Sequence, residues 1–341
     1  METNHNQSKP IIVAITANIA IAIAKGVGYL FSGSSALLSE TIHSFADVMN
    51  QALLYIGIKR GKKGETEEFH YGYSQERFFW NLVSAMGIFV LGCGVTVYHG
   101  IHDLLAESHH QPPALEQYII ETILLISMLA ESYSFYVATK EIKAQALVRG
   151  KKFFEYLEES LDPSVSAVFW EDAAAILGIL LAFTGILLST LTGNKVFDAS
   201  ASIIIGLLMG WIAYHLAIEN KKFLLDRSIP EFELNQLLEV LQKNTMILKY
   251  SDIKTVVLGP DRLKFTAKIE LNLKKLSEKK ISEITKQISK KDVLSDTSQV
   301  RKQIESYTET ISDSMEEELM KIENALKAKL PNLKHVELTI H

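Results

Sequence analysis

Long apolar stretches separated by short polar loops fill the chain as far as Asp226. Each stretch is close to the roughly 20 residues that an α-helix needs to cross a bilayer. Beyond Asp226 the pattern becomes charged, and no later stretch is apolar enough to span. The pattern predicts six membrane-spanning helices: Pro10–Phe31, Ala36–Ile58, Phe78–Ile101, Tyr118–Ala138, Val165–Leu191 and Ala199–Ile218.

The remaining segment, residues 229–341, mixes helical and strand periodicities. The stretch "ELNQLLEVLQKN" repeats apolar residues at helical spacing, whereas "RLKFTAKIEL" and "HVELTIH" alternate them as half-buried strands do. The order αββαβ predicts a small cytoplasmic ferredoxin-like α/β domain, with a helical insertion at about 276–313. The predicted fold class is therefore an α-helical membrane domain over 1–228 followed by this α/β domain.

Local signals mark two of the predicted helices. Asp162 and Pro163 suit the cap and the first turn of the fifth span, because an aspartate side chain accepts from free backbone N–H groups and proline needs no partner there. Gly206 and Gly210 form a GxxxG pattern in the sixth span, which lets a neighbouring helix approach closely.

Composition narrows the class of protein without naming a function. The net charge of −5 gives no reason to expect a nucleic acid partner, and the single Cys93 excludes an intramolecular disulfide. The opening "METNHNQSKP" lacks the cationic start of a signal peptide, so we expect the first helix to be retained.

Basic residues gather in the second and fourth loops, which predicts that these loops are cytoplasmic by the positive-inside rule. With six spans, both termini are then cytoplasmic, in a multi-pass protein that we expect in a bacterial inner membrane. The basic residues concerned are Lys59, Arg60, Lys62, Lys63, Lys140, Lys143, Arg149, Lys151 and Lys152.

The second span carries ionisable residues at helical spacing. Glu40, His43 and Asp47 lie on one stripe of the helix. Such groups at membrane depth usually face the interior of a bundle, so the stripe predicts a functional site. Lys25 in the first span fits either a role there or a side chain that snorkels to the membrane edge. Glu131 in the fourth span is also deep.

His43 and Asp47, one helical turn apart, can hold one cation between an imidazole and a carboxylate, and Glu171 with Asp172 in the fifth span can complete four ligands. Binding requires a neutral imidazole and ionised carboxylates, so protons leave as metal arrives. The residues thus predict exchange of a divalent cation for protons across the lipid bilayer. The metal is cargo, and we expect no resident cofactor.

Three stretches, "LLSETIHSFADVMNQALLYIGI", "HYGYSQERFFW" and "EDAAAILGILLA", resemble the cation diffusion facilitator family of metal transporters. The resemblance is greatest to the branch that includes the mitochondrial zinc transporter nine. It implies zinc efflux by proton antiport with alternating access, a homodimer and a metallochaperone-like C-terminal domain. It matches the family's ligand pair on the second span to His43 and Asp47.

The sequence departs from the family pattern in the fifth span, where the residue four before Asp172 is Val168 and cannot ligate. Glu171 and Glu40 are alternative replacements, and water is a third. The replacement exchanges an imidazole nitrogen for an oxygen donor, which is a harder ligand in the hard–soft sense. The site should therefore discriminate less sharply for zinc against manganese, iron(II) or cobalt.

Histidines outside the spans give weaker signals. The resemblance implies a second, cytoplasmic metal site at Glu67 and His70, while the alternative is a hydrogen-bonded loop anchored against Arg77. The C-terminal domain has too few histidines for a strong metal site, so we expect it to dimerise only. His99, His102, His109 and His110 cluster at the outer loop and are expected to be solvated, with capture of exiting metal as the alternative.

Two other functions fit parts of the pattern. A membrane-embedded metalloenzyme also uses histidines and acids at helical spacing, but it needs an open coordination position and a general base. A scaffold with a degenerate transport site would use the charged C-terminal segment to bind partners. The stripe of the second span argues against full degeneracy.

Overall fold

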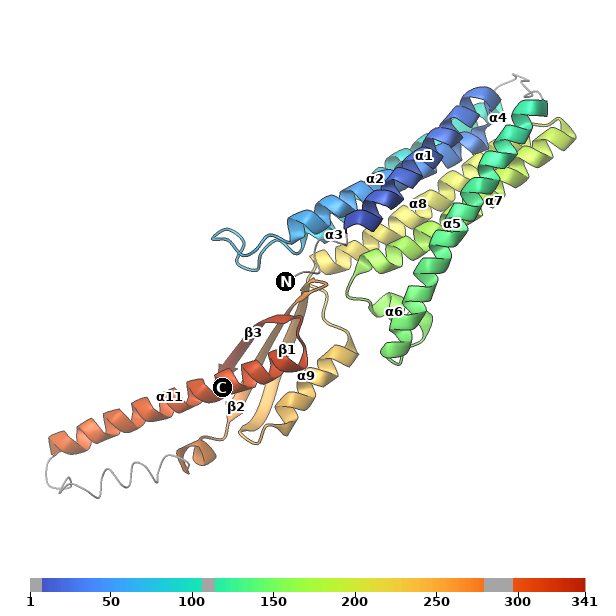
Figure 1. Cartoon of the computed structure of the whole chain (residues 1–341). Coiled ribbons are helices and arrows are strands. Elements are labelled where there is room, and N and C mark those ends of the chain that lie inside the picture. Colours follow the sequence, from blue (N-terminus) through green and yellow to red (C-terminus); the bar gives the residue numbers. More distant parts are fainter. Residues whose placement is uncertain (1–7, 106–113, 279–296, 341) are drawn as a thin grey trace. The chain divides into compact units, whose positions relative to one another are not determined.

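The chain folds into two compact units, Met1–Leu225 and Asp226–His341. The structure is a computed structural model that describes residues 8–105, 114–278 and 297–340. The first unit is a helical bundle, and the second combines helices with a small sheet (Figure 1). Each unit is described by itself below.

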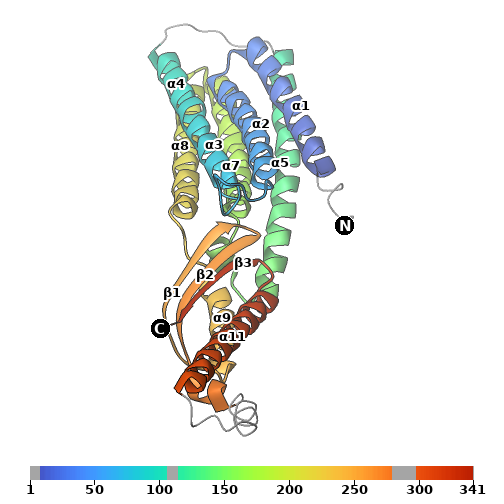
Figure 2. The same cartoon turned by 90° about the vertical axis from the view of Figure 1, so that its left-hand side faces the viewer.

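The helices of the first unit run side by side as long rods (Figures 1 and 2). Three of them, α3, η1 and α4, follow one another without a break, and η1 is a stretch of π-helix. A long helical segment therefore covers each of the six predicted spans. The helices are α1 (Ser8–Ser32), α2 (Ser35–Gly61), α3 (Glu76–Gly87), η1 (Ile88–Val95), α4 (Thr96–Leu105), α5 (Ala114–Val148), α6 (Phe153–Glu159), α7 (Pro163–Thr192) and α8 (Val196–Leu224).

Four of these segments are long and apolar enough to cross a membrane: Glu76–Leu105, Gln117–Val148, Pro163–Thr192 and Val196–Leu224. The apolar part found in α1, Asn18–Ser32, is shorter. Helix α2 is long, but its charged residues lower its hydropathy. The chain is thus an integral membrane protein, and the count of six spans stays a prediction.

Close packing of α8 against α4 and η1 explains the GxxxG pattern. A Cβ atom built on Gly206 would lie 2.8 Å from Val97 Cγ2, and one on Gly210 would lie 2.8 Å from Cys93 Sγ. Only glycine lets the backbones meet at this distance. The apolar core of the bundle includes Leu37, Ile120, Leu124, Ile179, Ile205 and Met209.

The start of α7 confirms the predicted cap. Asp162 accepts a hydrogen bond from the backbone N–H of Ser164 at 3.0 Å, and Pro163 occupies the first turn. The same carboxylate pairs with Arg77 on α3 at 2.8 Å. Asp162 therefore both caps α7 and links it to α3.

The second unit has the predicted element order αββαβ. In its sheet β2 is central, pairing antiparallel with β1 and parallel with β3. Phe265 on β2 lies opposite Thr255 on β1 and Val336 on β3. The elements are α9 (Glu231–Lys243), β1 (Ile247–Gly259), β2 (Arg262–Leu271), α11 (Thr297–Lys329) and β3 (Leu333–Ile340).

Strand β2 has one buried and one accessible face, as its alternating sequence predicts. The predicted inward residues, Phe265, Ala267, Ile269 and Leu271, are buried. Both helices contribute fully buried apolar side chains to this unit, and α11 contacts α9 and β3. The helices and the buried face of the sheet thus form its core. The buried helical residues include Leu237, Leu241, Ile322 and Leu326.

Part of the predicted insertion at 276–313 belongs to α11, which is one continuous helix from Thr297 onward. Residues 276–278 end a short helical turn, and residues 279–296 lie outside the described residues. Helix α11, with 33 residues, is the longest element of this unit.

Candidate metal centre

Ionisable and polar side chains from four helices meet inside the bundle. We call this group the interior cluster. It contains five carboxyl groups, one imidazole, one amide and one ammonium group. Its members are Lys25 on α1, Glu40, His43, Asp47 and Asn50 on α2, Glu131 on α5, and Glu171 and Asp172 on α7.

His43 and Asp47 form the pair that the helical spacing predicts. His43 Nε2 lies 3.6 Å from Asp47 Oδ2, and both side chains are largely buried. Donors bound at 2.0–2.2 Å to a tetrahedral ion lie roughly 3.3–3.6 Å apart. One cation therefore fits between these two atoms without a change in the helix.

Glu171 is held by an amide that the sequence analysis did not single out. Asn50 Nδ2 donates to Glu171 Oε1 at 2.7 Å and to Oε2 at 2.6 Å. Asn50 Oδ1 in turn accepts from Ser84 Oγ at 2.7 Å. This chain of hydrogen bonds places the Glu171 carboxylate against α2, on the stripe that carries Asp47.

Asp172 and Glu131 bring two more carboxyl groups to the same depth. Ser134 Oγ donates to Asp172 Oδ2 at 2.8 Å. Glu131 is 9% exposed and interacts electrostatically with Asp47, His43 and Asp172. The sequence suggested Glu131 only by its depth, and the fold places it near the α2 pair.

Lys25 and Glu40 form a buried ion pair between α1 and α2. Lys25 Nζ donates to Glu40 Oε2 and to Ser44 Oγ, each at 2.9 Å. Lys25 is 1% exposed, so its ammonium group does not reach water. The alternative that this lysine snorkels is therefore wrong, because its side chain points toward α2.

The fold brings together five of the seven residues predicted to bind metal, those on α2 and α7. Glu67 and His70 lie instead on an exposed loop, where Phe69 and Tyr73 pack with ring centroids 4.6 Å apart. Arg77, the expected anchor of that loop, pairs with Asp162. Among residues 8–105, 114–278 and 297–340, no three His, Cys, Asp or Glu side chains already surround a common metal position.

Val168 lies one turn before Asp172, as the sequence requires, and is 37% exposed. It lines a small recess with Asn50 and Asn81. A ligand at position 168 would thus lie beside the amide that holds Glu171.

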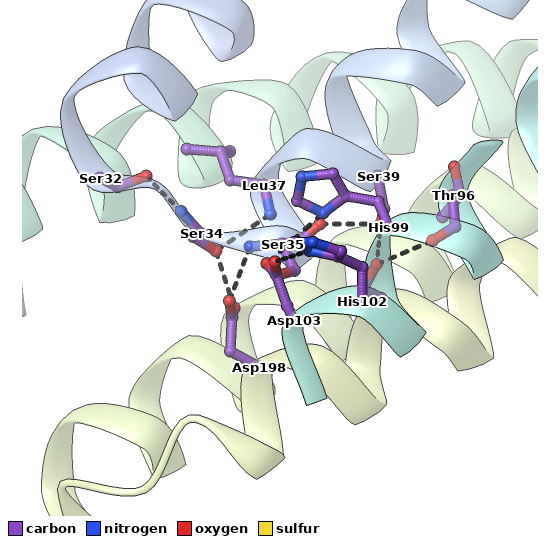
Figure 3. Close-up of polar contacts among 11 residues, drawn as sticks. Ser32, Ser34, Ser35, Leu37, Ser39, Thr96, His99, His102, Asp103 and Asp198 are labelled. Atoms are coloured by element: carbon purple, nitrogen blue, oxygen red, sulfur yellow. Dashed lines mark hydrogen bonds and ion pairs between the residues drawn. The ribbon is translucent and has the colours of Figure 1, made fainter. Parts of the chain in front are cut away.

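A second polar group lies where α1 ends and α2 begins (Figure 3). Asp198, on α8, accepts from Ser34 Oγ and from the backbone N–H of Ser35, both at 2.7 Å. Asp103, on α4, accepts from Ser35 Oγ. Two carboxylates from different helices therefore hold the first residues of α2.

His99 and His102 both face Asp103 (Figure 3), with Nδ1 atoms 3.4 Å from its two oxygens. His102 is exposed as expected, but His99 is only partly exposed. His109 and His110 lie outside the described residues. A cavity of about 250 Å³ adjoins this group. Its polar lining includes Ser32, Ser34, Ser35, Asp103, Gln117, Ser189, Thr190, Lys195 and Asp198.

Sequence reasoning missed Asn50 as a member of the interior cluster and left the role of Lys25 open. A signal existed for Asn50, which lies three residues after Asp47 and so extends the same stripe. Lys25 was noticed as an ionisable residue in an apolar span, but its partner Glu40 could not be predicted, because pairing between two helices depends on how they pack.

Membrane-length helices that enclose so many ionisable groups define an ion-handling membrane protein. The chain belongs to the cation efflux family, since a family model described as "Cation efflux transmembrane domain" matches residues 11–225. The predicted resemblance to cation diffusion facilitators, on the zinc transporter nine branch, is confirmed. This is a family of transporters rather than enzymes.

Relatives from distant organisms match most of the chain. Proton-coupled zinc antiporter SLC30A9, mitochondrial, from Homo sapiens is 31% identical over 338 residues, which are 97% of this chain and 58% of that protein. Metal tolerance protein C4 from Arabidopsis thaliana is 29% identical over 345 residues, 99% of this chain and 74% of the relative. An uncharacterized transporter from Methanocaldococcus jannaschii is 23% identical over 257 residues, which are 74% of this chain and 82% of that protein. The chain spans 58% of the length of the human relative.

Proposed function

We propose that this protein exports a divalent metal cation from the cytoplasm in exchange for protons. Zinc is the proposed cargo, with manganese, iron(II) and cobalt as alternatives. The name of the human relative, a proton-coupled zinc antiporter, supports both the cargo and the exchange. Membership of the cation efflux family supports the direction.

The main observation that supports the proposal is that the interior cluster has more carboxyl groups than cationic side chains. Five carboxyl groups lie with one ammonium group, that of Lys25. So many negative charges at membrane depth repel one another. A divalent cation or bound protons can each relieve this repulsion, so the two compete for the same groups.

The proposed ligands are His43 and Asp47 from α2 with Asp172 from α7. Glu171 or Glu131 supplies a further carboxylate. Asp172 is held by a serine hydroxyl and Glu171 by an amide, and both are neutral donors. A cation attracts a carboxylate more strongly than a neutral donor does, so these groups can turn to it on loading.

Exchange follows from the protonation that binding requires. The imidazole must be neutral and the carboxylates ionised when metal is bound, so arrival of the metal releases protons. Alternating access requires the bundle to open on one side at a time. The contacts of Asp198 and Asp103 with Ser35 support a state in which the end near Ser34 is held closed.

Glu67 and His70 are the proposed second metal site, on the loop between α2 and α3. Both side chains are exposed and three residues apart, so cytoplasmic metal can reach them. Two ligands alone give weak binding, which suits a place where metal is collected rather than stored.

We further propose cytoplasmic termini, a bacterial inner membrane and a homodimer joined through residues 229–341. The basic loops after α2 and α5 support the orientation. The second unit leaves Phe232, Leu248 and Met320 exposed, and a second copy can cover them.

Flux measurements in proteoliposomes test the proposal. The full chain is reconstituted with a zinc-sensitive dye inside acidic vesicles, and zinc is added outside. We expect zinc uptake that a protonophore lowers several-fold. Uptake no faster than in protein-free vesicles, at any pH gradient, contradicts the proposed transport.

A further inference from the structure

Behind His43, on the side away from Asp47, lies a carboxylate that is already neutralised. Glu40 is fully buried, and its Oε2 accepts from Lys25 Nζ at 2.9 Å. The same ammonium group donates to Ser44 Oγ. Glu40 is therefore fixed through one oxygen and leaves the other available.

Two polar atoms in this region have no hydrogen-bond partner. They are Glu40 Oε1 and His43 Nδ1, and both are shielded from solvent. Both face Gly178 on α7, because a Cβ atom built there would lie 2.5 Å from Glu40 Oε1 and 3.9 Å from His43 Nδ1. A buried carboxylate oxygen and a buried ring nitrogen, each without a partner, thus lie at one place on the α2–α7 contact.

Imidazoles that bind a metal through one nitrogen usually donate a hydrogen bond from the other nitrogen to a carboxylate or carbonyl. That hydrogen bond fixes the tautomer and turns the free lone pair toward the ion. In His43 the nitrogen that faces Asp47 is Nε2, so the nitrogen left for the supporting hydrogen bond is Nδ1.

We propose that Glu40 is a positioning residue that accepts the Nδ1–H of His43 when metal is bound, and that Lys25 is the counter-ion that holds Glu40 in place. This inference rests on the proposed function. It gives Glu40 a task other than direct ligation. It also explains the buried lysine, since an unpaired carboxylate at this depth would be costly.

Removing both charges together tests the inference without leaving a buried charge unpaired. The variant Lys25→Met with Glu40→Met stays neutral at this place and leaves His43 Nδ1 without an acceptor at position 40, and Lys25→Arg retains the pair. The matched control carries Lys59→Met and Glu141→Met, two exposed positions on α2 and α5. Size-exclusion chromatography and circular dichroism verify that each variant is folded.

Zinc affinity is the first measurement. The neutral double variant is expected to bind zinc about 10–100-fold more weakly than the unmodified chain, as is typical when a supporting partner of a ligand is lost. Lys25→Arg and the control should bind like the unmodified chain. Equal affinity in the neutral double variant overturns the inference.

The tautomer of His43 gives a readout that a merely structural ion pair would not change. In ¹⁵N-histidine NMR, with His43→Gln used for assignment, zinc-loaded protein should show protonated Nδ1 and metal-bound Nε2. The neutral double variant should show a mixture of metal-bound nitrogens. Metal on Nδ1 in the unmodified chain overturns the inference, as does the same single form in both proteins.

Crowding Glu40 from α7 provides an independent test. Gly178→Ala places a methyl group against Glu40 Oε1, whereas Gly185→Ala on the same helix places one 2.5 Å from Ala201 Cβ. Both variants overpack α7, but only the first displaces Glu40. A loss of zinc affinity with Gly178→Ala alone supports the inference, and equal losses in both overturn it. An unmodified chain that neither binds nor transports zinc overturns the proposed function instead, and this inference with it.

Discussion

At the scale of single residues, the ionisable side chains of α2 have different roles because they have different partners. His43 Nε2 and Asp47 Oδ2 lie 3.6 Å apart, a separation that two ligands of one cation can have. Glu40, on the same stripe, is tied to Lys25. Three ionisable groups within about two helical turns thus separate into a binding pair and a supporting carboxylate.

Loss of Asp47 should abolish transport. Asp47→Ala removes the only α2 carboxylate that lies beside His43 Nε2 in the described residues, so we expect metal-dependent flux to fall by more than about 100-fold, exceeding the 10–100-fold typical of supporting residues. The measurement is zinc uptake into proteoliposomes. Glu141→Ala, exposed on α5, is the control, and undiminished uptake in Asp47→Ala contradicts the proposed site.

Introducing an imidazole at position 168 should increase the selectivity for zinc over manganese. Val168→His adds a nitrogen ligand one turn before Asp172, and nitrogen ligands favour zinc over manganese. We expect the ratio of manganese to zinc dissociation constants to rise about tenfold, as measured by competition calorimetry.

Leu177→His is the matched control for this prediction, because it adds an imidazole to an exposed position of the same helix. An equal ratio in the two variants would show that Val168 does not face the metal.

At the scale of helices, close packing by small residues fixes the place of α8. Its glycines meet α4 and η1, and Ser202 Oγ lies 2.7 Å from Ser39 Oγ on α2. Asp198 then joins the first turn of α8 to the start of α2. At these positions α8 contacts α2, α4 and η1 through glycines and short polar side chains, which have little freedom to rearrange.

Adding a methyl group to this contact should destabilise the bundle. Gly206→Ala would place Cβ 2.8 Å from Val97 Cγ2 and 3.1 Å from the Val97 backbone nitrogen, which cannot move aside easily. We expect the free energy of unfolding to fall by about 1–3 kcal/mol, the usual cost of overpacking.

Thermal unfolding in detergent measures this change. Gly94→Ala in η1, where the nearest atom to the new Cβ is 3.8 Å away, should cost little. Equal melting temperatures for the two variants would mean that the α8 contact tolerates a wider separation.

At the scale of the whole chain, we expect the two units to have different functions, metal binding in the bundle and association of two copies in the second unit. The bundle holds the interior cluster, and the αββαβ unit contains no member of it. That unit nevertheless exposes apolar side chains such as Leu248 and Met320. Its contribution is therefore expected to be association of two copies.

Deleting residues 229–341 should weaken self-association, because the proposed dimer contact lies there. We expect the dimer fraction in detergent to fall from most of the protein to a minor share at equal concentration, as measured by analytical ultracentrifugation. An unchanged dimer fraction would place the contact in the bundle.

The sequence by itself determined the periodic features of this protein. Apolar length, alternation in β2, the cap at Asp162 and the spacing of His43 and Asp47 depend on residues close together in the chain, where helix and strand geometry is regular. Lys25 with Glu40, Asn50 with Glu171 and the approach of Glu131 were decided only by the tertiary structure. Each joins residues from different helices, and the distance between them depends on how whole helices pack, which local spacing does not encode.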